Sequence, residues 1–240
     1  MTWRSLRGAT RQPDALFLAI VLPSLLMLLF VYVFGGAMSV GIDYVNYVVP
    51  GVIVLCAGYG AAITAVSVAS DMERGVIDRF RSLPIDGSSV LTGHVLASMV
   101  RNMIATGIVL VVAYLAGFRA EAGVIDWTLA IGLILLFILA ISWLATVLAL
   151  LIGNSETANA ITSIMLFLPY LSSGFVPVDT MPAPLAAIAR HQPYTPLIEA
   201  MRSLLLGTPM GSNGVVAVVW LAGILVVSFV AARFLFRREA

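Results

Sequence analysis

The chain alternates long apolar stretches with short polar ones, and this pattern predicts helices that cross a membrane. A stretch of about 20 apolar residues spans a bilayer core of about 30 Å, because an α-helix rises 1.5 Å per residue. Short segments with charged residues, glycine or proline separate the stretches, so we expect connections between helices and no soluble domain between them. Six stretches can be marked: Ala15–Phe34, Tyr47–Ala69, Val90–Phe118, Trp127–Ile152, Ala158–Phe175 and Val215–Phe236.

The composition indicates that lipid surrounds most of these helices. Of the 240 residues, 61% are hydrophobic and 10% are charged, whereas about 25% of the residues in a soluble globular chain are charged. The mean hydropathy of +1.05 agrees with this. The first stretch is longer than the apolar core of about 7–15 residues in a signal peptide, which predicts a retained span. We therefore predict an all-α integral membrane protein, with six transmembrane helices in a single domain over residues 1–240.

The arginines predict the orientation. All 13 cationic residues are arginine, and a cytoplasmic N-terminus would place ten of them inside. This count includes Arg101, whose side chain we expect to reach the inner surface from the third span. The three on the outside would be Arg119, Arg190 and Arg202. The positive-inside rule then predicts that both termini are cytoplasmic, and that residues 1–13, which contain Trp3 and three arginines, form an interfacial helix.

The segment 71–86, between the second and third stretches, has the pattern of a short amphipathic helix. Ser70 and Glu73 have the spacing of a capping box, which predicts that a helix begins there, and Pro84 would end it. Its apolar face would consist of Val76, Ile77, Phe80 and Leu83. Two interpretations stay open: the helix docks into a groove of a cytoplasmic partner and transmits force to two spans, or it is an interfacial helix without a partner.

The segment 176–213 contains helix-like pieces that are too short to span a bilayer. The pieces are Leu185–Ala189 and Leu197–Leu206, and several prolines interrupt the segment. This pattern predicts a re-entrant hairpin in the outer leaflet, with an ordinary external loop carrying two surface helices as the alternative. Glu199 and Arg202, three residues apart, are predicted to form an ion pair.

Two groups of residues resemble a known family. Glu73-Arg74-Gly75 followed by Leu83-Pro84 resembles the cytoplasmic loop of the ABC-2 type transporter permeases. A second group is similar to the carboxy-terminal signature of that family: Ser173-Gly174, Pro177, Met181-Pro182, Pro193, Ala200, Arg202 and Gly207. The subgroup that the chain resembles is the daunorubicin-resistance, or DrrB-like, drug-efflux permeases, and the resemblance covers nearly the whole chain. One departure is the extra proline in the turn Pro193-Tyr194-Thr195-Pro196, which bears on the geometry of the hairpin.

This resemblance implies six spans, two permeases per complex as a homodimer or heterodimer, and two separate ABC ATPase subunits in the cytoplasm of a bacterium. It also implies that the segment from Glu73 to Leu83 is a coupling helix that contacts the ATPase, with these candidate residues: Glu73, Arg74, Gly75, Ile77, Phe80, Arg81 and Leu83. The candidate residues of the re-entrant signature are Gly174, Pro177, Pro182, Pro193, Glu199 and Arg202.

The absence of lysine bears on the source of energy. A Walker A loop needs a lysine to reach the nucleotide phosphates, and the chain contains none. We therefore expect no cofactor on this chain, with ATP and Mg²⁺ bound by the partner ATPase. The hydroxyl groups and aromatic rings of Tyr59, Thr64, Phe167 and Tyr170 suit a path for an amphipathic organic molecule, although helix packing would also explain them.

The leading prediction is a permease that exports a hydrophobic drug-like or lipid-like molecule from the cytoplasm or inner leaflet. An exporter of polysaccharide or cell-envelope lipid is an alternative with the same fold. A proton-driven secondary transporter needs carboxylates within the membrane, and most acidic residues fall at span ends or in loops. An intramembrane enzyme is disfavoured by the lack of H-E-x-x-H and G-x-S-x-G motifs. A membrane scaffold stays open, and the net charge of +1 gives no sign of nucleic-acid binding.

Overall fold

The computed structural model describes residues 13–38, 40–75 and 88–238, and every regular element within these ranges is helical. The predicted interfacial helix and most of the predicted coupling helix, with Ile77, Phe80, Arg81 and Leu83, lie outside the described residues. The elements are α2 (Pro13–Leu29), η1 (Phe30–Phe34), η2 (Gly35–Ala37), α3 (Tyr44–Glu73), α5 (Ser88–Leu115), α6 (Val124–Ile152), α7 (Ser155–Met165), η3 (Leu168–Leu171), η4 (Val178–Thr180), α8 (Ala183–His191), α9 (Tyr194–Leu206) and α10 (Asn213–Arg238).

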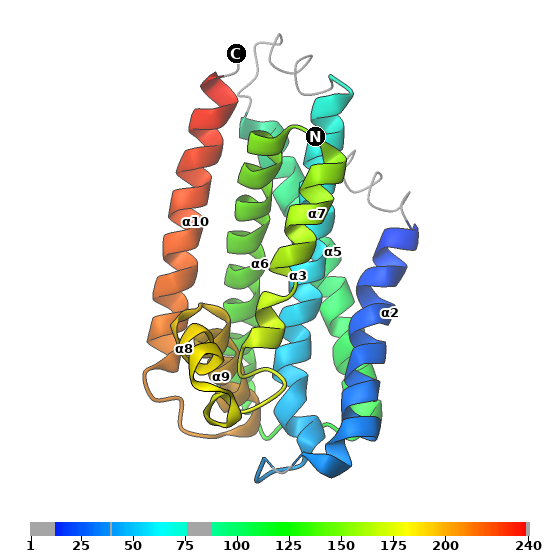
Figure 1. Ribbon diagram of the computed structural model, residues 1–240, viewed down its shortest axis with the longest axis vertical. Helices are drawn as coiled ribbons and strands as arrows, with labels where there is room; N and C mark the ends of the chain where they lie inside the picture. Colours follow the sequence, from blue (N-terminus) through cyan, green and yellow to red (C-terminus); the bar gives the residue numbers. More distant parts are fainter. Residues whose placement is uncertain (1–12, 39, 76–87, 239–240) are drawn as a thin grey trace.

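The long helices form a bundle with two distinct ends (Figure 1). At the end drawn uppermost, called the upper end here, α3, α6 and α10 finish and α5 and α7 begin. The short helices α8 and α9 lie at the opposite, lower end. The chain returns from the upper to the lower end through α7 and η3, which run beside α3 and α6.

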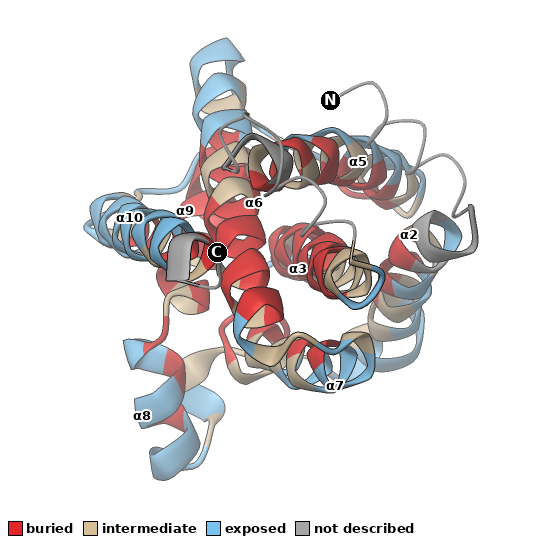
Figure 2. Cartoon of the chain, turned by 90° about the horizontal axis from the view of Figure 1, so that it is seen from above, coloured by how far each residue is buried: buried red, intermediate tan, exposed pale blue. Residues whose placement is uncertain are grey.

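Helix α3 occupies the centre of the bundle (Figure 2). Its neighbours are α2, α5, α6, α7 and α9, and most of its 30 residues are buried. Small residues such as Gly51, Ala57, Ala61 and Ala65 recur along it and are buried, which lets neighbouring backbones approach closely. The central helix is therefore also the one that ends at the predicted coupling segment.

The outer helices expose apolar side chains. On α10, Val219 and Phe234 are 65% and 71% exposed, and α2 and α5 carry similar residues. Five helices of the described part are long and apolar enough to cross a membrane, which is the pattern of a multi-pass membrane protein: Ala19–Ala37, Tyr44–Glu73, Leu91–Leu115, Val124–Ile152 and Asn213–Phe236.

The fifth predicted stretch, Ala158–Phe175, is not one continuous helix. Helix α7 ends at Met165, after 11 residues, which corresponds to about 17 Å. Turns and the 3₁₀ helix η3 follow, with Pro169 near its start. An apolar composition does not guarantee a continuous helix, because a proline contributes no backbone N–H group to it. The count of six spans stays a prediction.

The prediction that a helix begins at Ser70 is wrong. Helix α3 continues through Ser70 to Glu73, and the carbonyl of Ser70 accepts the backbone N–H of Arg74 at 3.1 Å. Gly75 follows with a φ of 63°, a left-handed conformation that glycine adopts without steric cost at helix ends. The spacing of a capping box also occurs within the last turn of a helix, so the spacing alone did not distinguish a start from an end.

Candidate functional site

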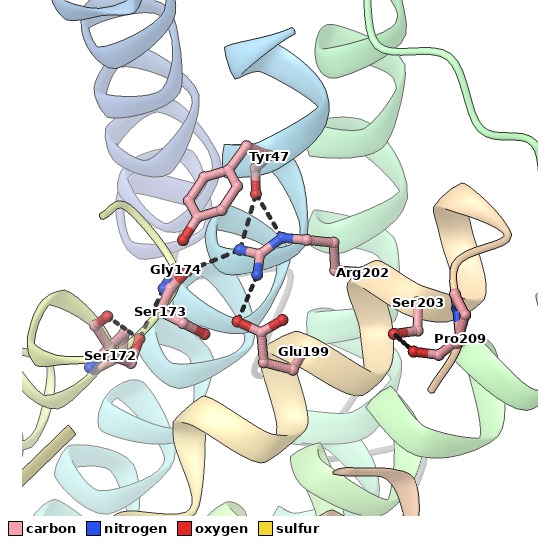
Figure 3. Close-up of polar contacts among 9 residues, drawn as sticks. Tyr47, Ser172, Ser173, Gly174, Glu199, Arg202, Ser203 and Pro209 are labelled. Atoms are coloured by element: carbon pink, nitrogen blue, oxygen red, sulfur yellow. Dashed lines mark hydrogen bonds and ion pairs between the residues drawn. The ribbon is translucent and has the colours of Figure 1, made fainter. Parts of the chain in front are cut away.

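Arg202 on α9 joins three separate segments (Figure 3). Its Nε and Nη2 atoms donate to the backbone carbonyl of Tyr47 at 3.2 and 3.1 Å, and Nη2 also donates to the carbonyl of Ser173 at 2.7 Å. Its Nη1 atom pairs with Oε1 of Glu199 at 2.7 Å, so the predicted ion pair is confirmed. The guanidinium also lies 3.9 Å from the centre of the Tyr47 ring.

The burial of Arg202 makes these contacts important for stability. Its side chain is 9% exposed, and that of Glu199 is 32% exposed. A buried guanidinium needs an acceptor for each desolvated N–H group, and here two backbone carbonyls and a carboxylate provide acceptors. Because the guanidinium is planar, it can donate to α3 and to the segment after η3 at the same time.

Gly174, a predicted signature residue, packs directly against α3. A Cβ atom built on Gly51 would lie 2.7 Å from the Cα and carbonyl oxygen of Gly174. One residue further, the carbonyl of Phe175 accepts the hydroxyl of Tyr44 at 2.8 Å. The start of α3 thus holds the segment 173–175 in three ways. Its backbone approaches Gly174 closely, the Tyr44 hydroxyl donates to Phe175, and Arg202 donates to carbonyls of both segments.

Sequence reasoning missed the residues that α3 contributes to this contact. They are Tyr44, Tyr47 and Gly51, which share one face of the helix at spacings of three and four residues. That spacing is a weak signal, because apolar residues with the same periodicity occupy the rest of α3. Gln192 was missed too, although its Nε2 atom donates to the carbonyl of Leu171 at 2.5 Å.

The signature prolines stand at helix starts. Pro182 precedes α8, Pro193 precedes α9, and Pro196 lies in the first turn of α9. Proline is tolerated there because the first backbone N–H groups of a helix have no partner within it. The extra proline of the turn Pro193-Tyr194-Thr195-Pro196 is therefore compatible with an ordinary helix start.

The two predicted short helices are present, but they differ in burial. The pieces Leu185–Ala189 and Leu197–Leu206 lie within α8 and α9. Helix α8 is largely exposed, whereas most residues of α9 are buried against α3, α6 and α10. Burial raises the pKa of Tyr194, the first residue of α9, to about 12. Helix α9 is accordingly part of the bundle core and does not lie on the surface.

At the upper end, Glu73 caps α7 from another helix. Its carboxylate accepts the backbone N–H of Ser155 at 2.9 Å and the Ser155 hydroxyl at 2.8 Å. The side chain of Asn154 accepts two further backbone N–H groups, from Glu156 and Thr157. A carboxylate at a helix N-terminus is favoured by the helix dipole and by the unpaired N–H groups. Arg74 and Gly75 follow Glu73, and Arg74 is exposed.

Three of the four residues predicted to line a substrate path lie together. Tyr59 on α3 lies close to Tyr170 on η3. The ring of Phe167 lies 6.3 Å from that of Tyr170 and is 67% exposed. Thr64 is separate from this group and belongs to a buried polar cluster.

Helix α7, which leads to Phe167, differs from the other outer helices in what it exposes. Its exposed residues include Glu156, Thr157, Asn159 and Ser163, whereas Ala158 and Thr162 are buried. Ile164 is exposed too, at 69%, but this side of the bundle carries hydrogen-bonding groups, unlike the apolar outer sides of α2 and α10.

The buried polar cluster joins α3, α5 and α6. The hydroxyl of Thr64 donates to Ser98 at 2.7 Å, and Ser98 lies 3.0 Å from the hydroxyl of Ser142. Asn102 donates to Ser98 at 3.2 Å. Two helical turns above Thr64, His94 contacts Asp71 at 3.1 Å. Polar groups thus follow the contact between α3 and α5 from the upper end into the bundle.

The prediction for Arg101 is wrong. Its Nη2 atom donates to Thr64 Oγ1 at 3.1 Å and to the carbonyl of Gly60 at 3.3 Å, so the side chain packs across α3 near the middle of α5. The sequence pattern predicts instead that it extends to the inner surface. The hydrogen-bond acceptors of the neighbouring helix decided its direction, and a hydropathy pattern does not contain that information.

This bundle of long apolar helices, with a buried polar cluster and a short-helix segment at one end, is the transmembrane domain of a multi-pass membrane protein. Residues 1–206 match the family model described as ABC-2 type transporter, and the chain belongs to that family.

Two relatives agree with this membership. The chain is 30% identical over 208 residues to the daunorubicin resistance ABC transporter permease protein DrrB1 of Streptomyces coeruleorubidus, covering 86% of this chain and 74% of the relative. It is 29% identical over 224 residues to the probable doxorubicin resistance ABC transporter permease protein DrrC of Mycobacterium tuberculosis, covering 92% and 81%. The resemblance that the sequence motifs indicated is therefore confirmed.

Proposed function

We propose that this chain is the membrane permease of an ATP-driven exporter that moves a hydrophobic drug-like or lipid-like molecule out of the cytoplasm or inner leaflet. Family membership and the two drug-resistance relatives support this proposal. In this proposal two cytoplasmic ABC ATPase subunits supply the energy, and a second permease, identical or related, completes the complex. The bacterial plasma membrane surrounds it.

The proposed transport path rests on one observation, which is that α7 exposes polar residues. Lipid does not offer hydrogen bonds to groups such as the Asn159 amide. In the assembled transporter this side therefore faces water or the second permease. It leads to Phe167 and Tyr170, whose rings would contact an amphipathic molecule.

The upper end would face the cytoplasm in this proposal. It contains the end of α3 and the start of α5, which flank segment 76–87, together with the end of α10. Both termini would then be cytoplasmic, and α7 with η3 would form the sixth crossing. Helix α9, together with α8, would correspond to the re-entrant segment at the outer side.

Affinity purification tests the partnership. The tagged chain is extracted in mild detergent from cells that co-express the neighbouring genes, and ATP hydrolysis by the eluate is measured. We expect a Walker-type ATPase to co-purify, with a hydrolysis rate that rises when a hydrophobic drug-like or lipid-like compound is added. Recovery of the chain alone, without nucleotide-dependent activity, would contradict the proposal.

Chemical labelling tests the path. In a Cys56→Ser background we expect Asn159→Cys on α7 to react with a water-soluble maleimide in the membrane-embedded complex. Val219→Cys on α10 is the control, because Val219 is also exposed but is expected to face lipid. Equal reactivity of the two cysteines would mean that α7 does not border water.

A further inference from the structure

Arg101 carries a charge in the part of the protein where a charge is most costly. It lies 13 residues after the start of α5 at Ser88, or about 20 Å along the helix axis. Its partner Thr64 is nine residues from the end of α3, which corresponds to about 14 Å. A cation at this depth costs about 2.5–3.5 kcal/mol on insertion scales, so such residues are usually functional.

Within residues 13–38, 40–75 and 88–238, this charge has only neutral partners. The contacts of Arg101 run from Nη2 to a hydroxyl and a backbone carbonyl, and the Nε atom is buried without a partner. Among the described residues, no carboxylate contacts Arg101, and Asp71 is occupied by His94. The buried Arg202 provides a contrast, because it has both a carboxylate and two carbonyl acceptors.

The surroundings of Arg101 suit a molecule with an apolar tail. Arg101 is partly exposed, and its neighbours on α5, Val100 and Ile104, are exposed. The apolar side chains continue along the outside of the helix in both directions, with Leu96, Ile108 and Val111 also exposed. A tail could lie on this row of side chains while a polar headgroup reaches the guanidinium.

We propose that Arg101 binds the acidic headgroup of an amphipathic ligand, a carboxylate or phosphate, whose acyl chain lies along the exposed side of α5. This inference rests on the proposed function and narrows its substrate class from hydrophobic compounds in general to acidic ones. The guanidinium provides the charge, and the carbonyl of Gly60 and the hydroxyl of Thr64 hold it in place from α3. An acidic group would complete the pairing that the described residues leave open.

Spin-labelled lipids test the proposal directly on the permease reconstituted in phosphatidylcholine vesicles. Electron paramagnetic resonance measures the fraction of label whose motion the protein restricts. We expect ionised spin-labelled stearate to associate about tenfold more strongly than its methyl ester, which corresponds to about 1.4 kcal/mol. Arg101→Gln should abolish this preference, and Arg101→Lys should retain most of it. Arg190→Gln, a surface arginine on α8, is the matched control and should leave the preference unchanged.

Two comparisons make the outcome decisive. Unchanged association of the methyl ester with Arg101→Gln would show that the variant is folded and that its apolar side is intact. A spin-labelled phosphatidylglycerol distinguishes the sources: dependence on Arg101 assigns the site to a membrane lipid, and dependence of stearate alone assigns it to a single-chain acid. Equal binding of stearate and ester by the unmodified chain, or equal stearate binding by Arg101→Gln, would overturn the inference. Because no ATPase takes part, this result is independent of the test for the exporter.

Discussion

At the scale of single residues, Arg202 and Arg101 show that the same residue type has different roles in different surroundings. Arg202 is bound by a carboxylate, two backbone carbonyls and an aromatic face, and it fastens α9 to α3. In the described part of the chain, the acceptors of Arg101 are neutral, namely the Gly60 carbonyl and the Thr64 hydroxyl. We therefore expect substitution of Arg202 to affect stability and substitution of Arg101 to affect ligand binding.

Replacing Arg202 by glutamine should destabilise the protein by about 3–5 kcal/mol, because it leaves Glu199 and two carbonyls without their partner in a buried setting. Thermal unfolding in detergent measures this effect. Arg202→Lys should recover only part of the loss, since an ammonium lacks the planar fork. Arg190→Gln breaks an exposed pair with Asp179 and should leave the unfolding temperature unchanged. Equal unfolding temperatures for Arg202→Gln and the parent chain would contradict the stabilising role.

Gly51→Ala should destabilise the bundle by about 1–3 kcal/mol, because the added Cβ atom would force the backbone at Gly174 to move. Gly132→Ala on α6 is the control, since nothing lies within 4 Å of its Cβ position. Alanine favours a helix more than glycine does, so this control should unfold at the same temperature or a higher one. A comparable loss in both variants would mean that the close approach at Gly174 is unimportant.

At the scale of elements, Glu73 connects two helices that the chain order separates by 82 positions. It ends α3 beside the predicted coupling segment and caps the N-terminus of α7, the helix with the polar exposed side. A displacement of the segment after Glu73 would therefore reach α7 directly. If Glu73 takes part in coupling, this contact would transmit movement from the coupling segment to α7. The roles of Glu73, Arg74 and Gly75 in coupling stay predictions.

Glu73→Ala should reduce transport per ATP hydrolysed, with the protein still inserted and at normal abundance. Ser155→Ala should have a smaller effect in the same direction, because the backbone N–H of Ser155 still donates. The double variant should be no worse than Glu73→Ala alone, since both remove one contact. Glu156→Ala, an exposed acid in the same turn, is the control. If the effects of the two substitutions were strictly additive, Glu73 would act through something other than its contact with Ser155.

At the scale of the whole molecule, different structural elements lie at the two ends of the bundle. The upper end contains the helix ends that flank segment 76–87, and the lower end contains α8, α9 and the turn after Gly207. An exporter needs such a difference, because the ATPases act on one side and the substrate leaves on the other. The orientation in the membrane is therefore the property that most directly tests the proposed arrangement.

In a Cys56→Ser background, Thr208→Cys should react with an impermeant maleimide in intact cells, because Thr208 is exposed at the lower end. Arg74→Cys, exposed at the upper end, should react only after the cells are opened. Ser203 is unsuitable for this experiment since it is buried beside Pro209. Labelling of Arg74→Cys in intact cells would reverse the orientation and remove the basis for cytoplasmic termini.

The sequence by itself determined the properties that depend on neighbouring residues along the chain. Apolar stretches of sufficient length determined the fold class and the five long helices, and the spacing of Glu199 and Arg202 determined their ion pair. The motifs around Glu73 and Gly174 were sufficient to indicate the family. These are short-range features, because a helix brings residues three or four positions apart into contact.

Only the tertiary structure decided which groups meet between helices. It placed Tyr47 and Ser173 around Arg202, directed Arg101 toward α3, and brought Glu73 to the start of α7. It also showed that the fifth stretch breaks after Met165 and that Ser70 lies inside α3. Hydropathy records how apolar a position is but not which acceptor lies across the helix interface. Packing and the need to satisfy buried polar groups make that choice.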